Sequence, residues 1–588
     1  MVKLSYIIFV LALTSVLWGV NSAWSQNNLL STTTDSIGLD YRSGGVSLDS
    51  IDASFIGTLN LRPGSGDLRL IEFDLPVAFG DQLNGLSYRM NEFRVQPKWT
   101  GLPYLGFQYA FGSRLNQAMN LEFHQYFKPN THLHFRYYRR TSNGFLRNSD
   151  FVLNDVSLLF VHSKNKFSTE LKAYYGADEQ GENEGVIGDS LIPVFPLEFI
   201  GVQNESGRSQ VRLLDVEWTN YFRALGDSTL GSGFMSNHNY DLRGRQYTSS
   251  IVDPSIFDTL FIDTLETRDQ YQTASISNGA GVYFNSPKIS AEAALNHRYW
   301  RNQNRGVNVD TNEAFLDANV ILRINNSTKL KSYFYANFLG ALGELKSHNS
   351  LTFRTSKKFQ LQGSLNFENS YPDPYLRNHV ANYYAWSIPQ GQLELQQMLS
   401  VSGVMKYGKK NHVVSKLNWT SVNNGRYFID GDWRQDTLDL ISMGSIGFQA
   451  QFKFGGWAFY PGVTLRFQSN NFNYQPSFST LNRISYSTKV FSNNLGVAIG
   501  ADLGYDSGYS FLNYNGVLGV MSPFSGTLDA TALVRINAFA ALSVDEFRFF
   551  VRAENIDYFI NDPISRVGES VPLMPFLIRI GLTWDFFN

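Results

Sequence analysis

The histidines are the residues of this chain best suited to metal or acid–base chemistry, and the sequence contains 9 of them but no cysteine. The lack of cysteine excludes disulfides, thiolate metal sites and cysteine nucleophiles. His132 and His134 stand two positions apart, so their imidazoles would share one face of a strand and could bind a metal together. Arg136 follows on that face, where its charge would repel a cation. We therefore expect polar strand side chains here, with no metal site and no cofactor.

Hydrolysis would require a serine or acidic nucleophile, or paired acids, with a histidine close by. The chain has no G-x-S-x-G pattern, in which a sharp turn exposes a nucleophilic serine. We therefore expect no catalytic residues and no enzyme activity.

Acidic residues gather in three segments that contain few basic residues. These segments could bind divalent cations that bridge lipid phosphates, or give a pore mouth a preference for cations. Their spacing lacks the glycine and the terminal glutamate of a calcium loop, and solvated, self-repelling loops are the alternative. The acidic residues are Asp178, Glu179, Glu182, Glu184 and Asp189; Asp253, Asp258, Asp263, Glu266 and Asp269; and Asp430, Asp432, Asp436 and Asp439.

The composition limits the classes of protein that could carry these residues. Of the 588 residues, 17% are charged and 15% are aromatic, the net charge is −2 and the mean hydropathy is −0.21. This chain is too polar for a bundle of membrane helices and too aromatic for a disordered protein. Because no basic run is longer than Arg139-Arg140, we do not expect nucleic acid as a partner.

The N-terminus has the pattern of a secretory signal. Lys3 precedes an apolar run from Tyr6 to Leu13, and Ala23 and Ser25 provide the small residues of a cleavage site. The apolar run is shorter than the roughly 20 residues of a spanning helix, and an uncleaved membrane anchor is the alternative. We predict a cleaved signal peptide and export from the cytoplasm.

Alternation with a period of two residues runs through much of the remaining chain. It is regular over residues 166–175, 315–324 and 547–554, where one face is apolar and the other is polar or charged. Soluble sandwiches also alternate, but their strands centre on about 5–6 residues, whereas membrane strands need about 9–11. The segments here are longer than sandwich strands, and tight turns alternate with long polar loops, as they do in outer-membrane barrels.

The sequence therefore predicts an all-β fold, namely a large, closed, antiparallel transmembrane β-barrel of about 22 strands, within 18 to 24. Short turns would face the periplasm, and long loops the cell exterior. The division of the chain would be a signal peptide at 1–25, a flexible extension at 26–66 and the barrel at 67–588. Strands are predicted at 105–111, 119–128/131–140, 153–163/166–176, 210–224/236–250, 270–285/288–300, 313–324/328–340, 347–356/358–370, 393–407/411–422, 440–454/457–468, 488–504/509–520, 528–541/546–556 and 575–587.

The last strand carries the pattern of a barrel-assembly signal. An alternating C-terminal strand that ends in aromatic residues provides the lipid face of the strand that closes the barrel. It would make the barrel-assembly machinery a partner during insertion, whereas a soluble sheet ending in an amphipathic strand is the alternative. The predicted lipid-facing residues are Phe576, Ile578, Ile580, Leu582, Trp584 and Phe586.

The polar faces of the predicted strands would line the lumen. Charges there would keep water inside and orient polar solutes in a transverse field, or they would simply pair with one another across neighbouring strands. The predicted lumen charges are Arg136, Glu170, Lys172, Asp317, Arg323, Lys329, Lys331, Arg548, Arg552, Glu554 and Arg579.

Two regions of the chain resemble the Bacteroidota "putative porin" family of outer-membrane proteins. The first joins LPYLGFQYAFGS at 102–113 with RYYRRTSNGFLRN at 136–148, and the second joins VRAEN at 551–555 with RIGLTWDFF at 579–587. These motifs cover under a fifth of the chain. The resemblance implies a barrel in the outer membrane and a channel, and it brings no catalytic residues with it.

We expect a porin-like channel in the cell outer membrane for passive diffusion of small polar solutes, with outer-membrane lipid around it and an undetermined oligomeric state. A TonB-dependent receptor would need a large globular plug before its barrel, whereas alternation here begins near residue 104. An uptake barrel of that type without a recognisable plug is one alternative. A non-conducting barrel in an outer-membrane secretion or assembly complex is the other.

Overall fold

The computed structural model describes residues 103–587 apart from several short gaps. The predicted signal peptide, the predicted extension and the predicted barrel residues before 103 lie outside the described residues. The gaps are 129, 188–191, 193–194, 227–230, 251–259, 305–306, 357, 373–377, 389–393, 430–431, 437–439, 469–475, 511, 524–528, 531, 561–565, 569–570 and 574.

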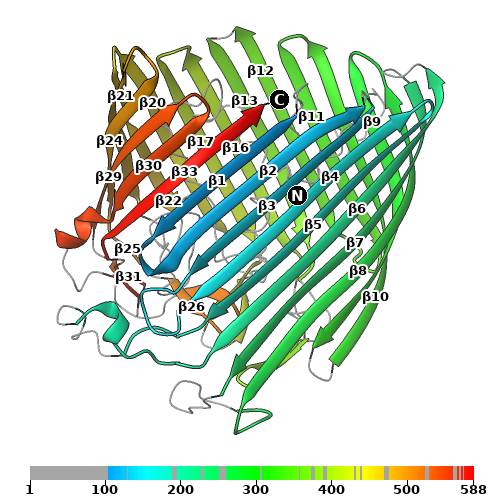
Figure 1. The fold of residues 1–588 in the computed structure, drawn as a ribbon. Helices are drawn as coiled ribbons and strands as arrows, with labels where there is room; N and C mark the ends of the chain where they lie inside the picture. Colours follow the sequence, from blue (N-terminus) through cyan, green and yellow to red (C-terminus); the bar gives the residue numbers. More distant parts are fainter. Residues whose placement is uncertain are drawn as a thin grey trace.

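The described residues form one closed antiparallel barrel of 22 strands (Figure 1). The strands β21 and β22 are two halves of one strand, interrupted at Pro461, which has no N–H to donate to the ladder. The strands are β1 (Tyr104–Gly112), β2 (Asn116–Lys128), β3 (Thr131–Ser142), β4 (Phe151–Lys164), β5 (Phe167–Gly181), β6 (Arg208–Gly226), β7 (Gly231–Ser249), β8 (Thr267–Asn285), β9 (Ile289–Asn304), β10 (Val307–Asn325), β11 (Thr328–Leu339), β12 (Leu345–Ser356), β13 (Phe359–Ser370), β16 (Gln396–Gly408), β17 (His412–Asn423), β20 (Ile441–Phe454), β21 (Trp457–Tyr460), β22 (Gly462–Gln468), β23 (Phe478–Val490), β24 (Leu495–Asp506), β29 (Leu533–Val544), β30 (Phe547–Glu554) and β33 (Leu577–Phe587).

The barrel closes between its first and last strands. β1 pairs with β33 in continuous antiparallel register from Tyr104 opposite Phe587 to Gly112 opposite Arg579. In Figure 1 these strands, blue and red, lie side by side. This closure leaves no open sheet edge, which a membrane does not tolerate. The predicted all-β fold, closure and strand number are confirmed.

The two ends of the barrel differ in their connections. Turns of two to four residues join β2 to β3, β4 to β5 and the later hairpins at one end, which is also the end where β33 finishes. At the other end, long connections such as residues 182–207 and 507–532 join neighbouring strands. The long loops are therefore gathered at one end, as predicted, although that end also has short connections such as residues 113–115 between β1 and β2.

One predicted hairpin was wrong. Residues 488–504 and 509–520 are not a strand pair, because the barrel strands there are β23 and β24, joined by a turn at 491–494. This turn contains no glycine or proline and instead holds Phe491, Ser492 and Asn493 at positive φ. The loop predicted between the strands 457–468 and 488–504, at residues 469–487, accordingly includes most of β23, and the two errors offset each other in the strand number.

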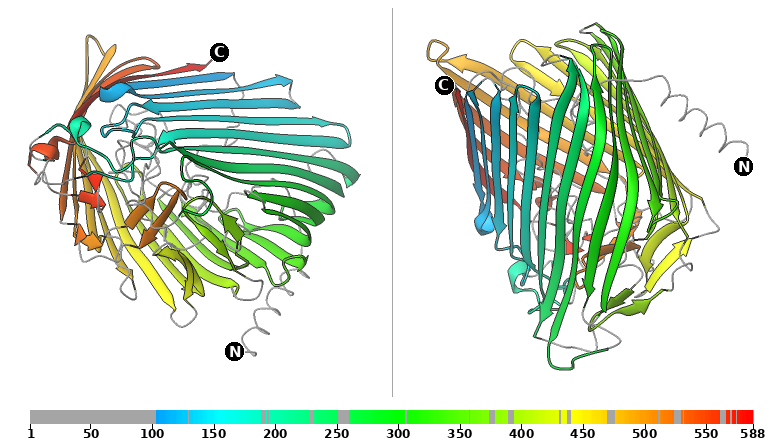
Figure 2. Two further views of the ribbon diagram at one scale, coloured as in Figure 1. Left: turned by 90° about the horizontal axis from the view of Figure 1, so that it is seen from below. Right: turned by 90° about the vertical axis from the view of Figure 1, so that its right-hand side faces the viewer.

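Short hairpins fold within the long connections. These are β14 (Asn378–Val380) with β15 (Ala385–Ser387), β18 (Gly425–Ile429) with β19 (Asp432–Asp436), β25 (Tyr509–Ser510) with β28 (Asp529–Ala530), β26 (Leu512–Asn515) with β27 (Val520–Pro523), and β31 (Arg566–Gly568) with β32 (Val571–Pro572). Figure 2 (left) shows the β26–β27 hairpin inside the ring of barrel strands. The described part of the chain has no helix long and apolar enough to cross a bilayer.

Candidate functional site

The barrel wall has two chemically different faces. Large apolar side chains on the outer face are exposed, including Trp218 at 48%, Phe222 at 53% and Leu295 at 60%. Charged side chains on the inner face are buried, and Arg140 and Arg579 are almost completely inaccessible. This is the arrangement of a barrel whose outside contacts hydrocarbon and whose inside is polar.

One ladder of ion pairs crosses the inner wall from β23 to β33. Arg483 Nε lies 2.6 Å from Asp502 Oδ1, and Arg552 Nη2 lies 3.0 Å from Asp502 Oδ2. Arg552 Nε also lies 3.3 Å from Glu554 Oε1. The other carboxylate oxygen of Glu554, Oε2, lies 3.0 Å from Arg579 Nη2. Each carboxylate is therefore shared between two guanidinium groups, so the ladder is continuous across these strands.

The ladder reaches across the closure of the barrel. Arg579 Nη1 on β33 donates a hydrogen bond of 2.9 Å to Asn116 Oδ1 at the start of β2. On β1, Tyr104 donates from its hydroxyl to Asp585 Oδ1 of β33 at 2.7 Å. The seam between the first and last strands thus has side-chain bonds in addition to its backbone ladder.

A second polar network lies on the inner faces of β5, β6, β9 and β10. Lys172 Nζ lies 2.9 Å from Glu170 Oε1 and 3.3 Å from Glu217 Oε2. Arg298 Nε donates to Glu313 Oε2 at 2.9 Å. Carboxylates outnumber cations in these contacts, so this side of the lumen is acidic.

The structure brings some of the predicted lumen charges together and separates others. Glu170 and Lys172 form one contact group, and Arg552, Glu554 and Arg579 form another. The remaining charges lie apart from both groups: Arg136 donates to Asn120 at 2.7 Å, Arg323 donates to Ser290 at 3.2 Å, Arg548 lies 3.9 Å from Asp585, and Asp317 stands opposite Ala294 and Tyr335 in the ladder. Lys329 stands opposite Arg323, and Lys331 is two positions further along the same face of β11.

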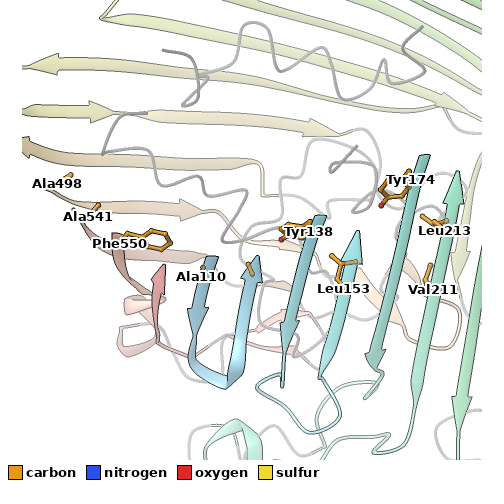
Figure 3. Packing of buried hydrophobic residues seen from close by; sticks show 10 residues of the cluster. Ala110, Tyr138, Leu153, Tyr174, Val211, Leu213, Ala498, Ala541 and Phe550 are labelled. Atoms are coloured by element: carbon orange, nitrogen blue, oxygen red, sulfur yellow. The ribbon is translucent and has the colours of Figure 1, made fainter. Parts of the chain in front are cut away.

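Part of the inner wall is apolar, which the sequence analysis did not predict. A buried cluster extends along neighbouring strands from β24 through β1 to β6 (Figure 3). Its members are Ala110, Ala118, Tyr138, Leu153, Tyr174, Val211, Leu213, Ala498, Ala541 and Phe550. The lumen lining is therefore a mixture of charged ladders and apolar wall.

The long loops form an aromatic core at their end of the barrel. Trp386, Phe428, Trp433 and Leu518, from three different connections, pack together with Tyr271 of the β8 wall. The rings of Phe428 and Trp433 meet edge to face with centroids 5.6 Å apart. Because these loops bury apolar side chains on one another, they form a folded layer at this end of the lumen.

Polar contacts hold the tip of the 507–532 loop to the wall and to the 182–207 loop. Arg245 of β7 donates to the carbonyl oxygen of Gly516 and lies 3.6 Å from Glu182. Glu184 accepts from the Gly516 amide at 3.4 Å. Burial, reinforced by the neighbouring Glu182 carboxylate, raises the pKa of Glu184 to about 8.

The acidic segments are less solvated than free loops would be. Asp178, Glu182 and Asp269 are buried, and Asp269 accepts from the backbone amide of Asn382 at 2.9 Å. Asp263 accepts from the amide of Leu265 at 2.8 Å. Of the other predicted acidic residues, Asp189, Asp253, Asp258, Asp430 and Asp439 lie outside the described residues.

The two histidines of β3 are buried in the wall. His134 Nε2 lies 3.1 Å from Glu122 Oε1, and the ring of His124 has its centroid 6.2 Å from that of His132 and 5.7 Å from that of His134. Among the described residues, no group of three or more histidine, aspartate or glutamate side chains has the geometry to hold a metal ion.

Comparison with known families decides the classification of this barrel. A family model described as "Putative porin" matches residues 99–588. The chain belongs to this family. Family membership and the closed barrel together place the protein in the outer membrane. No curated protein matches the chain.

Solved structures with a similar barrel include transporters and receptors. The FrpB iron transporter from Neisseria meningitidis aligns with a TM-score of 0.55 at 9% identity, covering 83% of each chain. The siderophore receptor PirA from Acinetobacter baumannii aligns with a TM-score of 0.54 at 8% identity, covering 84% of this chain and 81% of that one. The copper transporter OprC aligns with a TM-score of 0.57 at 10% identity, covering 84% and 82%. At these identities the likeness is one of fold alone.

Within this porin-family barrel, the C-terminal strand presents its two faces to different surroundings. Ile578, Ile580, Trp584 and Phe586 are exposed on the outer face, whereas Arg579 is buried on the inner face. Leu582 is half-buried on the outer side, and Phe576 lies just before β33, where its ring contacts Phe559.

Sequence reasoning missed several residues of the inner wall. Arg140 lies four positions from Arg136 on the same strand face, so the alternation alone could have identified it. Asp502 stood within a predicted strand and could have been found in the same way. Arg483 was missed because the predicted loop at 469–487 covered it.

Proposed function

We propose that this porin-family barrel is an outer-membrane channel through which small polar solutes diffuse passively. The observation that carries this proposal is the inner wall, where charged ladders line a closed barrel whose outer face is apolar. Such a lining offers hydrogen-bond partners to water and to hydrated solutes, so both can occupy the lumen. No chemical step is required, and we propose no enzyme activity, no catalytic residues and no cofactor.

The folded loop layer supports a channel that is narrowed at one end. Its aromatic core and the Arg245–Gly516 contact position it at the long-loop end. By the usual orientation of outer-membrane barrels, this end faces the cell exterior and the short turns face the periplasm. Solutes would then pass the loop layer first and the charged wall afterwards.

Conductance in a planar lipid bilayer tests the proposal. Purified full-length protein should insert with stepwise current increments, and current through the inserted channels should persist without an energy source. A bilayer that stays silent while the protein is inserted and folded would contradict the channel and favour a structural barrel in a secretion or assembly complex. Folding can be verified by the altered electrophoretic mobility of unheated barrel samples.

Energised uptake is the second candidate function. We consider it because the fold is similar to those of FrpB, PirA and OprC. Uptake of this kind would depend on an energised inner membrane, whereas passive diffusion would not. Solute entry into cells expressing the protein, measured with and without dissipation of the inner-membrane potential, separates the two. Solute entry that stops when the inner-membrane potential is dissipated would favour energised uptake over passive diffusion.

The same proposal includes export of the chain and insertion of the barrel into the outer membrane. We propose that residues 1–25 are a signal peptide and that the barrel-assembly machinery recognises β33 through its outer apolar face. The N-terminus of the mature protein from outer-membrane preparations, determined by mass spectrometry, should begin at Gln26.

A further inference from the structure

Cations on the inner wall usually have a carboxylate partner. Arg483, Arg552 and Arg579 share Asp502 and Glu554, and Arg535 lies 2.9 Å from Asp506. Lys172 contacts two glutamates. A group of cations without such partners on this wall is therefore an exception that calls for an explanation.

Four cations near the short-turn end are such a group, which we call the basic tetrad: Arg323 of β10, Lys329 and Lys331 of β11, and Arg354 of β12. Within the described chain, no carboxylate forms a salt bridge with any of the four. The charges that act on Lys329 are those of the other three members. The tetrad is thus a local concentration of positive charge on the wall.

The strand register fixes how close its members are. Arg323 stands directly opposite Lys329, and Lys331 is two positions further along the same face of β11. Lys329 stands opposite Thr352, and Arg354 is two positions beyond Thr352 on that face of β12. Residues two apart on a strand are separated by about 7 Å, and opposed residues by about 5 Å. Like charges at these positions repel one another, so the unliganded tetrad costs stability.

Hydroxyl side chains lie beside the tetrad. Arg323 Nη1 donates to Ser290 Oγ at 3.2 Å, which orients its guanidinium group. Ser350 stands opposite Lys331, and Thr352 opposite Lys329, so each lysine has a hydroxyl beside it on the same face. Arg354 is exposed, and the other three cations are half-buried, so a solute in the lumen can reach them.

We propose that the basic tetrad binds a polyvalent oxyanion of the phosphate type, either free or carried by a solute that crosses the lumen. Two arginine forks, two ammonium groups and two hydroxyls match an anion with several oxygen acceptors and more than one negative charge. The bound anion removes the repulsion within the tetrad. The proposal rests on the proposed function in one respect, because it assigns anionic solutes to the channel.

Binding of inorganic phosphate to the purified full-length barrel, measured by titration calorimetry in detergent, tests the site without requiring conductance. The double variant Lys329→Gln, Lys331→Gln should bind phosphate at least about tenfold more weakly than the wild type. Lys416→Gln is the matched control, because Lys416 lies on the inner face of β17 opposite Val404 and Gly447. It should leave the phosphate affinity unchanged. Sulfate should compete with phosphate at the wild-type site.

The thermal unfolding temperature gives a second test of the phosphate site. A folding defect in the double variant would lower this temperature, whereas the proposal predicts that it rises. Because glutamine removes like-charge repulsion, the double variant should unfold at a higher temperature than the phosphate-free wild type. Phosphate should raise the unfolding temperature of the wild type but not that of the double variant. Absence of saturable phosphate binding by the wild type, or equal binding by the double variant, would overturn the site.

Bilayer recordings separate failure of the site from failure of the channel. In a conducting channel, the double variant should shift the anion-to-cation permeability ratio towards cations, and Lys416→Gln should shift it less. An unchanged ratio together with unchanged phosphate binding rejects the tetrad and leaves the channel standing. A silent bilayer with phosphate binding that the double variant loses rejects the channel and supports the tetrad as a binding site.

Discussion

Arg579 shows how a single side chain contributes to the closed barrel. Its guanidinium group is buried, contacts both oxygens of Glu554 and donates to Asn116, which is 463 residues away in the chain. The alternation of the last strand was sufficient to predict that Arg579 points inward. Its partner on β2 was beyond sequence reasoning, because that contact exists only once β1 and β33 have closed the barrel.

Replacing Arg579 should weaken the barrel more than replacing an exposed arginine. In Arg579→Gln, Glu554 loses one of its two cations in a buried position, so the free energy of unfolding should fall by about 3 kcal/mol. Urea unfolding in detergent micelles, followed by tryptophan fluorescence, measures this change. Arg301→Gln is the control, because Arg301 and Asp310 form an exposed pair on the outer face and should contribute little. Equal losses in both variants would refute the role given to the buried ladder.

The strand β33 illustrates what alternation predicts well and what it misses elsewhere. Its outer residues and its inner Arg579 have the faces expected from the sequence. The turn at 491–494 was missed because it lacks glycine and proline, although Ser492, Asn493 and Asn494 interrupt the apolar alternation there. Sequence patterns therefore locate strands and faces more securely than turns built from ordinary residues at positive φ.

Charge on the outer face of β33 should impair assembly. Trp584→Asp places a carboxylate where 43% of the tryptophan is exposed on the outer face, and a charge in contact with lipid is costly. We expect a several-fold lower amount of folded barrel in the outer membrane, measured by quantitative immunoblotting of unheated samples.

Thr583→Asp is the matched control for this prediction. Thr583 is the preceding residue on the inner face and stands directly opposite Arg548, so an aspartate there meets a cation. Its folded amount should remain close to that of the wild type. Normal levels of the Trp584→Asp protein would show that the outer face of β33 does not meet lipid.

Docking of the 507–532 loop should depend on pH through Glu184. Burial raises the pKa of Glu184 from 4.5 to about 8 in the docked structure, and we expect undocking to expose the carboxyl and lower this pKa, so the docked state binds more protons than the undocked state between these values. Docking stability is therefore highest below about pH 4.5, falls as the pH rises towards 8 and levels off above it. Among the groups that face Glu184, Glu182 lies on the 182–207 loop, and Arg245 and Tyr247 lie on β7.

Hydrogen exchange at the amides of Gly516 and Gly519 measures this dependence. After correction for the intrinsic exchange rate, protection should decrease between pH 5 and pH 8 in the wild type. In Glu184→Gln it should be nearly constant, because the replaced group does not titrate. The same decrease in both proteins would assign the pH dependence to another group.

The complete barrel combines features that the sequence predicted with others that only the folded chain reveals. Strand number, closure and the sorting of short turns and long loops followed from local patterns. The aromatic core of the loop layer did not, because Trp386, Phe428 and Leu518 come from separate connections with no common pattern. The unequal distribution of charge, with acids on β5–β10 and the basic tetrad on β10–β12, likewise depends on register between strands.

The central claim is that one face of each strand meets water in the lumen and the other meets hydrocarbon. The chain has no cysteine, so single cysteines can report on each face separately. Ser402 and Val401 are neighbours in the middle of β16, with Ser402 bonded to Ser364 on the inner face and Val401 opposite Leu365 on the outer face. In outer-membrane vesicles, a charged, water-soluble maleimide should label Ser402→Cys rapidly and Val401→Cys hardly at all. Faster labelling of Val401→Cys, or equal labelling of both, would contradict the assignment of the two faces.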